Sequence, residues 1–198
     1  AGLKDRALST SSKELSMRIS IAKIAVLGLL ISASLTFADP NSGPDAGTKL
    51  TKLKVAVVTG DDAGKEVDFI GTRKDAPTVY LLVAADKFDR PLARFMKVLD
   101  TDLKKDRADI QIVAIWLADD VAKYKEYLPK AQQSMKFEQT TLGVHPGDVN
   151  GPEGFNIHTG AHLTVVIADK QTVVASLGFR SVNDTDVPGI VEKLPKKR

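Results

Sequence analysis

The fold is decided by TVYLLV at residues 78–83 and DRPLARFMKVLDTDLK at residues 89–104. The first stretch is an almost continuous apolar run, which is typical of a strand covered on both faces of a sheet. The second predicts an amphipathic helix that begins at Arg90, because apolar residues recur three or four positions apart along it. Asp89 is a candidate N-cap, and Pro91 is tolerated in the first helical turn. These stretches predict a buried strand that leads into a helix packed against its sheet.

Strands and helices alternate along the rest of the chain. The runs 54–59 and 65–69 flank a turn rich in Gly and Asp and predict a hairpin. Further strands are predicted over residues 110–117, 162–168 and 172–177, helices over residues 119–135 and 187–194, and a long loop over residues 143–156. Pro129 is expected to kink the first of these helices or to begin a second segment. The order β-β-β-α-β-α-β-β-α predicts an α/β domain with helices flanking its sheet.

The amino-terminal region has the pattern of a secretory signal peptide. Residues 17–38 contain Arg18 and Lys23, then the apolar run IAVLGLLISASLTF at 24–37, then small residues that offer a cleavage point before Asp39. This order predicts an exported protein, periplasmic or extracellular, with no stable membrane span once the peptide is removed. The alternatives are a retained anchor, for which the run is short, and a buried core helix.

The sequence divides into an amino-terminal extension with a predicted signal peptide, a leader, one domain and a tail. Residues 1–16 precede Met17 and lack apolar periodicity, so they are interpreted as a non-native upstream extension. Residues 39–52 are rich in Pro, Gly, Ser and Asp and are predicted to be a flexible leader. The folded domain is expected over residues 53–195, followed by a basic tail at 196–198.

Composition excludes several classes of function. The 198 residues include no Cys, which removes disulfides, thiol nucleophiles, iron–sulfur clusters and Cys-ligated zinc. The net charge of +3 resides in the first 38 residues, and the remaining 160 carry 23 basic and 23 acidic side chains. That balance is not the electrostatic pattern of a polyanion binder, so no nucleic-acid partner is expected.

The element order resembles that of the thioredoxin-like (redoxin) superfamily. In that superfamily a strand, a Cys-X-X-Cys loop and a helix with an apolar stripe follow one another. Aligned on the helix, Phe88 stands where the superfamily has Trp, and residues 89–92 (Asp-Arg-Pro-Leu) stand where it has Cys-Gly-Pro-Cys. The run VVIADKQTVV at 165–174 is similar to the final hairpin of exported redoxins. The resemblance implies a thioredoxin-like fold over about residues 53–194, with a central mixed sheet and an amino-terminal hairpin.

Two departures from the superfamily bear on activity. Asp89 and Leu92 lack sulfur, so the chain cannot form the thiolate on which disulfide exchange and thiol peroxidase chemistry depend. His162 stands just before the hairpin strand, where the superfamily has a cis-proline. The sequence therefore resembles a cysteine-less, exported redoxin without redox activity, and no catalytic residue or cofactor is predicted.

Phe88, Asp89, Arg90 and His162 are the candidate binding residues. The resemblance places them at the former active-site groove, where such folds hold extended peptides. Free amides and the helix dipole at the helix start favour an anion, which Asp89 provides as an N-cap. The leading hypothesis is a protein of the bacterial cell envelope that binds a protein or small-molecule ligand in this groove. The alternative is a cysteine-independent enzyme in which His162 acts as a general base beside Asp89.

A histidine metal site is a weaker interpretation. His145, His158 and His162 lie within 18 positions, and Asp148 and Glu153 fall between them. The four-residue spacing of His158 and His162 suits one metal ion on a helix, whereas this segment leads into a strand. Loop and core roles are therefore expected for the histidines, and no metal is predicted.

Overall fold

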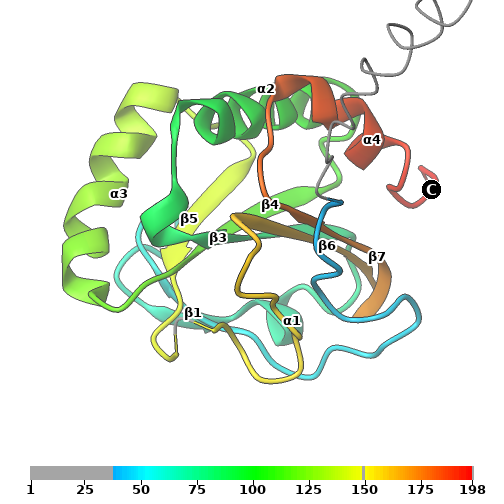
Figure 1. Ribbon diagram of the computed structural model, residues 1–198, viewed down its shortest axis with the longest axis horizontal. Coiled ribbons are helices and arrows are strands. Elements are labelled where there is room, and N and C mark those ends of the chain that lie inside the picture. The colour runs from blue at the N-terminus through cyan, green and yellow to red at the C-terminus, as the bar shows by residue number, and fades with distance from the viewer. Residues whose placement is uncertain (1–37, 149, 198) are drawn as a thin grey trace, which may run out of the picture. The chain divides into compact units, whose positions relative to one another are not determined.

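Seven strands form one mixed sheet in the spatial order β2-β1-β5-β4-β3-β6-β7 (Figure 1). Strands β3, β4 and β5 are parallel neighbours, and every other pairing is antiparallel. The predicted mixed sheet and its amino-terminal hairpin, β1–β2, are confirmed. The strand bounds are β1 (Lys54–Val57), β2 (Glu66–Asp68), β3 (Thr78–Ala84), β4 (Gln111–Leu117), β5 (Thr140–Val144), β6 (Leu163–Asp169) and β7 (Thr172–Phe179).

The computed structural model describes residues 38–148 and 150–197. The predicted upstream extension at 1–16, and the predicted signal peptide except for Ala38, lie outside these residues. In the described part of the chain, none of the helices combines the length and the apolar character that a membrane crossing requires.

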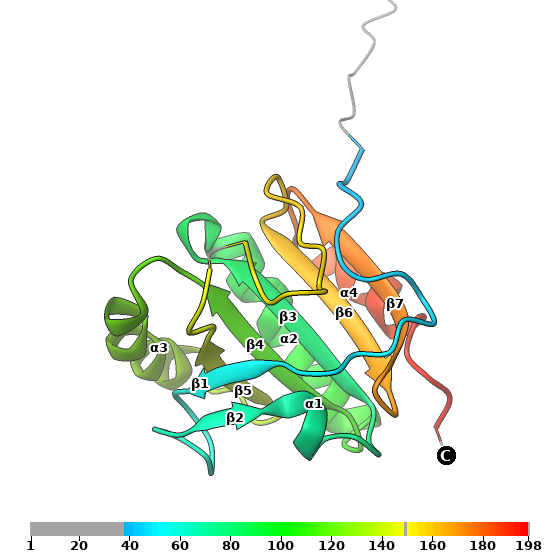
Figure 2. The same cartoon turned by 90° about the horizontal axis from the view of Figure 1, so that it is seen from below.

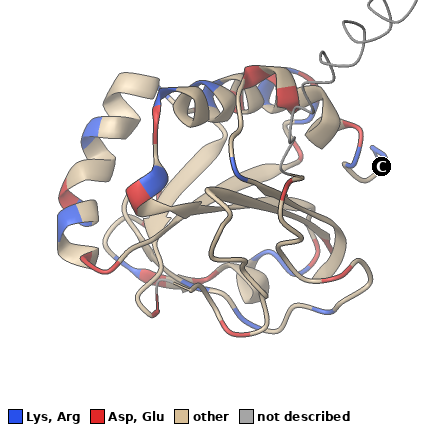
Figure 3. Ribbon diagram, in the orientation of Figure 1, with Lys and Arg blue, Asp and Glu red and all other residues tan. Residues whose placement is uncertain are grey.

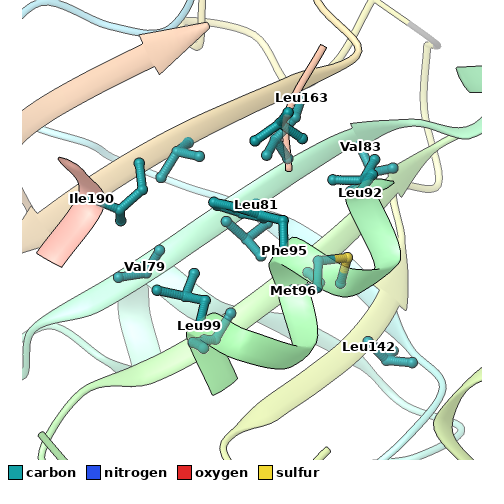
Figure 4. Packing of buried hydrophobic residues seen from close by; sticks show 14 of the residues in the cluster. Val79, Leu81, Val83, Leu92, Phe95, Met96, Leu99, Leu142, Leu163 and Ile190 are labelled. Carbon is teal, nitrogen blue, oxygen red and sulfur yellow. The ribbon is translucent and has the colours of Figure 1, made fainter. Parts of the chain in front are cut away.

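Helices cover one face of the sheet. Apolar side chains of one stripe of α2 point toward β3 and are at most 1% exposed (Figure 4). The helix stripe predicted from the sequence is therefore confirmed. The long helix α3 continues through Pro129, so the predicted second segment does not form. The helices on this face are α2 (Arg90–Asp106), α3 (Val121–Met135) and α4 (Val187–Val191), with the 3₁₀ turns η1 (Ala85–Lys87) before α2 and η2 (Asp184–Asp186) before α4.

Irregular chain covers the opposite face of the sheet (Figure 2). The short helix α1 (Phe69–Thr72), residues 50–53 and the loop between β5 and β6 pack there. Phe155 from that loop is 1% exposed, and Tyr80 of β3 is 2% exposed. A second apolar core therefore forms without a helix of more than one turn on this face.

The amino-terminal residues 39–50, here called the strap, extend this cover over β6 and β7. Ser42 is 2% exposed, and its hydroxyl lies 2.6 Å from that of Thr164 in β6 and accepts a 2.9 Å hydrogen bond from the His158 amide. The backbone of Val173 in β7 makes two further bonds, donating to Thr48 and accepting from Gly47. The prediction of a flexible leader at 39–52 is wrong, because these residues are fixed to the sheet.

The small residues of the strap give it the composition of a linker. Gly178 of β7 faces the strap so closely that a Cβ there would lie 2.7 Å from the Cβ of Ser42. Gly43 has φ of +102°, and a Cβ there would lie 2.5 Å from the Cβ of Ser176. Gly and Ser are typical of flexible linkers, but their small size also allows the close approach of two backbones.

Strand β5 was not predicted, and it overlaps the first two residues of the predicted loop at 143–156. Its sequence, TTLGV, is short and contains Gly143, which weakens the strand pattern. The glycine is needed because β1 lies against it, and a Cβ at this position would be 2.9 Å from the Ala56 carbonyl oxygen. Close backbone approach therefore explains the missed strand.

Candidate functional site

The amino end of α2 is a capped helix start. The Asp89 carboxylate accepts a 2.9 Å hydrogen bond from the Leu92 amide, as the sequence predicts for an N-cap. Leu92, at the second of the two positions where the resemblance expects sulfur, is 1% exposed and belongs to the core. Of the two positions that the resemblance aligns with cysteines, Asp89 therefore caps the helix and Leu92 fills the interior.

Phe88 begins a row of aromatic side chains. It is half-buried and packs edge-on against buried Trp116, with ring centroids 5.2 Å apart. Its ring centroid is also 6.4 Å from that of Tyr127, which is 40% exposed, and Tyr127 packs edge-on against Tyr124. The row therefore runs from the core of the sheet to the surface of α3.

His162 lies beside η1, at the start of β6. Its amide donates to the Phe179 carbonyl, and its own carbonyl accepts from the Ala84 amide at 3.0 Å. Hydrogen bonding to Lys87 lowers the pKa of Asp86, and the nearby charge of His162 contributes to the same shift. Within residues 38–148 and 150–197, no hydrogen bond or ion pair joins His162 to Asp89. The acidic neighbour of His162 is thus Asp86.

Arg90 is exposed on the first turn of α2. No ion pair or hydrogen bond engages its guanidinium in the part of the chain that the structure describes.

The name α2 rim is used here for the four candidate residues Phe88, Asp89, Arg90 and His162. The structure brings its first three members together through the chain itself, and β3–β6 pairing places His162 opposite the end of β3, from which η1 leads to them.

A cavity of about 500 Å³ opens beside the α2 rim, at the carboxyl ends of β3 and β4. The floor of the cavity is apolar and its border is polar. Figure 3 shows acidic and basic residues side by side at the turn before α2 and acidic residues just before α3, the two segments that border it. The polar side chains that line it are Asp86, Asp119, Asp120, Lys123, Tyr124, Asn150, His158 and Thr159.

The sequence patterns do not predict this cavity, because Asp119 and Asp120 fall at the start of the predicted helix 119–135. A usable signal was present, because the carboxyl ends of neighbouring parallel strands meet at one edge of a sheet and commonly form ligand sites there. The predicted strands 78–83 and 110–117 satisfy that condition, and Asp119 follows the second of them.

The histidines are not gathered around one point. His145 contacts the Lys54 carbonyl through Nδ1, at 3.3 Å, whereas His158 accepts a 2.9 Å hydrogen bond from the Gly160 amide. Among the described residues, no three His, Asp or Glu side chains are arranged to hold a metal ion. The loop roles that the sequence suggests for these two residues therefore agree with their contacts.

Comparison with known proteins places the chain by its fold. No protein-family model matches it, and no curated protein sequence matches it. Solved structures do match, among them a candidate protein disulfide isomerase from Bacteroides thetaiotaomicron, with 18% sequence identity and a TM-score of 0.54. That match covers 78% of this chain and 94% of the other.

Two further structures support the same assignment. A candidate thiol:disulfide interchange protein DsbE from Chlorobium tepidum is 16% identical, with a TM-score of 0.55 over 76% of this chain and 95% of that one. A peroxiredoxin-like protein from Aquifex aeolicus is 12% identical, with a TM-score of 0.53 over 76% and 88%. The chain therefore has the thioredoxin-like fold of the redoxins, as its sequence predicts, and it contains no cysteine.

Proposed function

We propose that this chain is an exported, redox-inactive thioredoxin-like domain that binds a protein segment or small ligand at the α2 rim. The observation that carries the proposal is the Asp89 cap. Where a redoxin presents a reactive thiol at this helix start, the carboxylate here is bonded to the Leu92 amide and serves the helix. With no cysteine in the chain, the same scaffold retains a shaped surface without the atom that exchanges electrons.

The surroundings of the cap suit contact with a partner. Arg90 is exposed, and Phe88 is half-buried in front of the aromatic row that continues to Tyr127. Aromatic and Arg side chains are the residues that most often dominate binding energy at protein interfaces. The adjoining cavity offers room for a side chain of the ligand.

Binding is tested by affinity capture from a cell-envelope extract with the purified chain as bait. Phe88→Ala and Arg90→Glu are expected to lose a partner that the unchanged chain retains. Lys105→Glu is the matched control for the charge reversal, because Lys105 is exposed at the far end of the same helix. Partners retained equally by all variants with unchanged melting temperatures would reject the α2 rim as the contact surface.

The absence of redox activity is tested separately. Insulin reduction and peroxide turnover are expected to be blank with the purified chain, since each needs a thiolate or an equivalent redox group. Turnover above the buffer background would contradict the proposal, whichever residue carried it.

Export is tested by sequencing the amino end of the protein recovered outside the cytoplasm. The pattern at residues 17–38 supports cleavage before Asp39. A mature protein that begins near Asp39 is the expected result. Material that retains the apolar run 24–37 would favour the anchor instead.

A further inference from the structure

The cavity beside the α2 rim has an apolar floor and an acidic border. The floor consists of the side chains of Leu82, Leu117, Ile157 and neighbouring alanines. The carboxylates around it belong to Asp86, Asp119 and Asp120. An aliphatic chain that ends in a cation would bury its carbon atoms on the floor and keep its charge among the carboxylates, as Lys and Arg side chains do at protein surfaces.

An anion is not expected in this cavity. The two helix starts that lie near it, those of α2 and α3, are already occupied by carboxylates of the chain. Asp89 accepts from the Leu92 amide, and Asp120 accepts from the Lys123 amide, each at 2.9 Å. At each helix start a carboxylate of the chain therefore already occupies the place that an external anion would take.

The carboxylates differ in how free they are. Asp86 forms a 2.7 Å ion pair with Lys87, and Asp120 is the cap of α3. Asp119 has no hydrogen bond or ion pair to any of the described residues, and it is exposed at the cavity border. Asp119 is therefore the carboxylate available to a ligand.

A cation of the chain already lies at the border of this cavity. The Lys123 ammonium is 5.3 Å from the centroid of the Tyr124 ring, within the range of a cation–π contact. The ring is held in place because its hydroxyl donates a 3.1 Å hydrogen bond to the Ala85 carbonyl. The lining thus accommodates an ammonium beside an aromatic face.

We infer that the cavity is a subsite for a basic side chain, Lys or Arg, of an extended segment bound at the α2 rim. The inference rests on the proposed function and adds the chemistry of the bound segment. Asp119 would pair with the charged end, the apolar floor would contact the aliphatic stem, and Lys123 would have to move aside or share the Tyr124 ring.

The test uses three acetylated and amidated pentapeptides, Ala-Ala-Xaa-Ala-Ala, in which Xaa is Lys, norleucine or Glu, titrated into the purified chain by isotope-edited NMR. The Lys peptide is expected to bind about fivefold more tightly than the norleucine peptide, the scale of one exposed ion pair. The Glu peptide is expected to bind least, and added salt is expected to reduce the preference for Lys.

Two variants with opposite signs sharpen the test. Asp119→Asn is expected to remove the preference for Lys over norleucine, with Asp102→Asn as the control on an exposed Asp of α2.

Lys123→Met keeps the aliphatic stem and removes the competing ammonium, so it is expected to strengthen binding of the Lys peptide about threefold. Lys130→Met, an exposed Lys of the same helix, is its control.

The results separate this inference from the proposed function. Equal binding of the three peptides, with loss of all binding in Phe88→Ala, would leave the α2 rim as a binding surface and overturn the basic-side-chain subsite. A Lys preference unchanged in Asp119→Asn would overturn it as well. Failure of every peptide to bind would overturn the subsite, while the capture experiment would still decide the proposed function.

Discussion

The two faces of the sheet are covered by chain of different kinds. On one face, α2, α3 and α4 bury apolar stripes, and the contacts are between side chains (Figure 4). On the other, α1, the loop from β5 to β6 and the strap lie across the strands, where backbone hydrogen bonds and buried hydroxyls add to a second apolar core (Figure 2). The difference shows that a thioredoxin-like sheet can be closed on one side with almost no helix.

The comparison predicts that the helix face contributes more to stability per side chain. Phe95 lies on the inner side of α2, is fully buried, and packs against Phe179, with ring centroids 6.4 Å apart. Phe95→Ala is expected to lower the free energy of unfolding by about 4 kcal/mol, through lost burial and the cavity left behind. Urea unfolding followed by circular dichroism measures this.

Its control is Arg94→Ala, since Arg94 is exposed on the same turn and makes only a 4.0 Å contact with Asp184. That change is expected to stay within about 0.5 kcal/mol. A Phe95→Ala effect no larger than the effects of the strap variants below would reverse the comparison.

Substitution of Gly178 tests the strap by steric pressure. A Cβ at this position would lie 2.7 Å from that of Ser42 and closer still to the Pro40 carbonyl. Gly178→Ala is expected to cost about 2 kcal/mol and to lift the strap, because overpacking forces backbone shifts. Limited proteolysis should then cut within residues 39–50 faster than in the unchanged chain.

Gly189→Ala in α4 is the matched control, because no heavy atom lies within 4 Å of a Cβ built there. It should leave both the stability and the cleavage rate of the strap nearly unchanged. Equal cleavage rates in the two variants would show that the strap is not held by its fit against β7.

Removal of the Ser42 hydroxyl tests the strap by hydrogen bonding. Ser42→Ala leaves the buried Thr164 hydroxyl and the His158 amide without their partner in the strap. The expected loss is about 1.5 kcal/mol, the usual cost of a buried polar group left unsatisfied. Native-state hydrogen exchange at the His158 amide should accelerate, whereas Ser134→Ala, on the exposed side of α3, should not change it.

A pH titration probes the strap face with the smallest expected effect. Burial raises the pKa of Tyr80 to about 12, against about 10 in an unfolded chain. Below pH 10 the phenol is neutral in both states, so its contribution to stability is fully present. Between pH 10 and 12 only the unfolded chain ionises, and that contribution declines by about 1.4 kcal/mol at pH 11.

Tyr80→Phe isolates this contribution from the other groups that titrate in alkali. The stability difference between the unchanged chain and the variant is expected to shrink between pH 9 and pH 11, measured by urea unfolding at each pH. A constant difference would mean that the phenol meets water in the folded state, and that the cover over this face is looser than the structure shows.

The same contrast explains how much was predictable from the sequence. The stripe of α2 is periodic and the run of β3 is continuously apolar, so the helix face followed from the sequence pattern, whereas the positions aligned with cysteines followed from the resemblance. The cap at Asp89 followed from local chemistry. The fixed position of the strap could not be predicted, because Ser42 and Gly43 contact Thr164, Ser176 and other residues far along the chain.

The candidate site divides in the same way. Phe88, Asp89 and Arg90 are consecutive, so the alignment of one helix was enough to place them together. The cavity required Asp86, Asp119 and His158 from three separate segments, and only the parallel pairing of β3 and β4 brings the first two together. Single-sequence patterns do not report that kind of proximity.

The long-range partners of the strap determine when it can dock on the sheet during synthesis. Ser42 bonds to a residue 122 positions later, and Asp39 accepts from the Arg180 amide 141 positions later. A chain made amino end first thus holds its earliest domain residues unattached until nearly all of β6 and β7 has left the ribosome. Contacts of such long range form slowly, since the loop between them must close first.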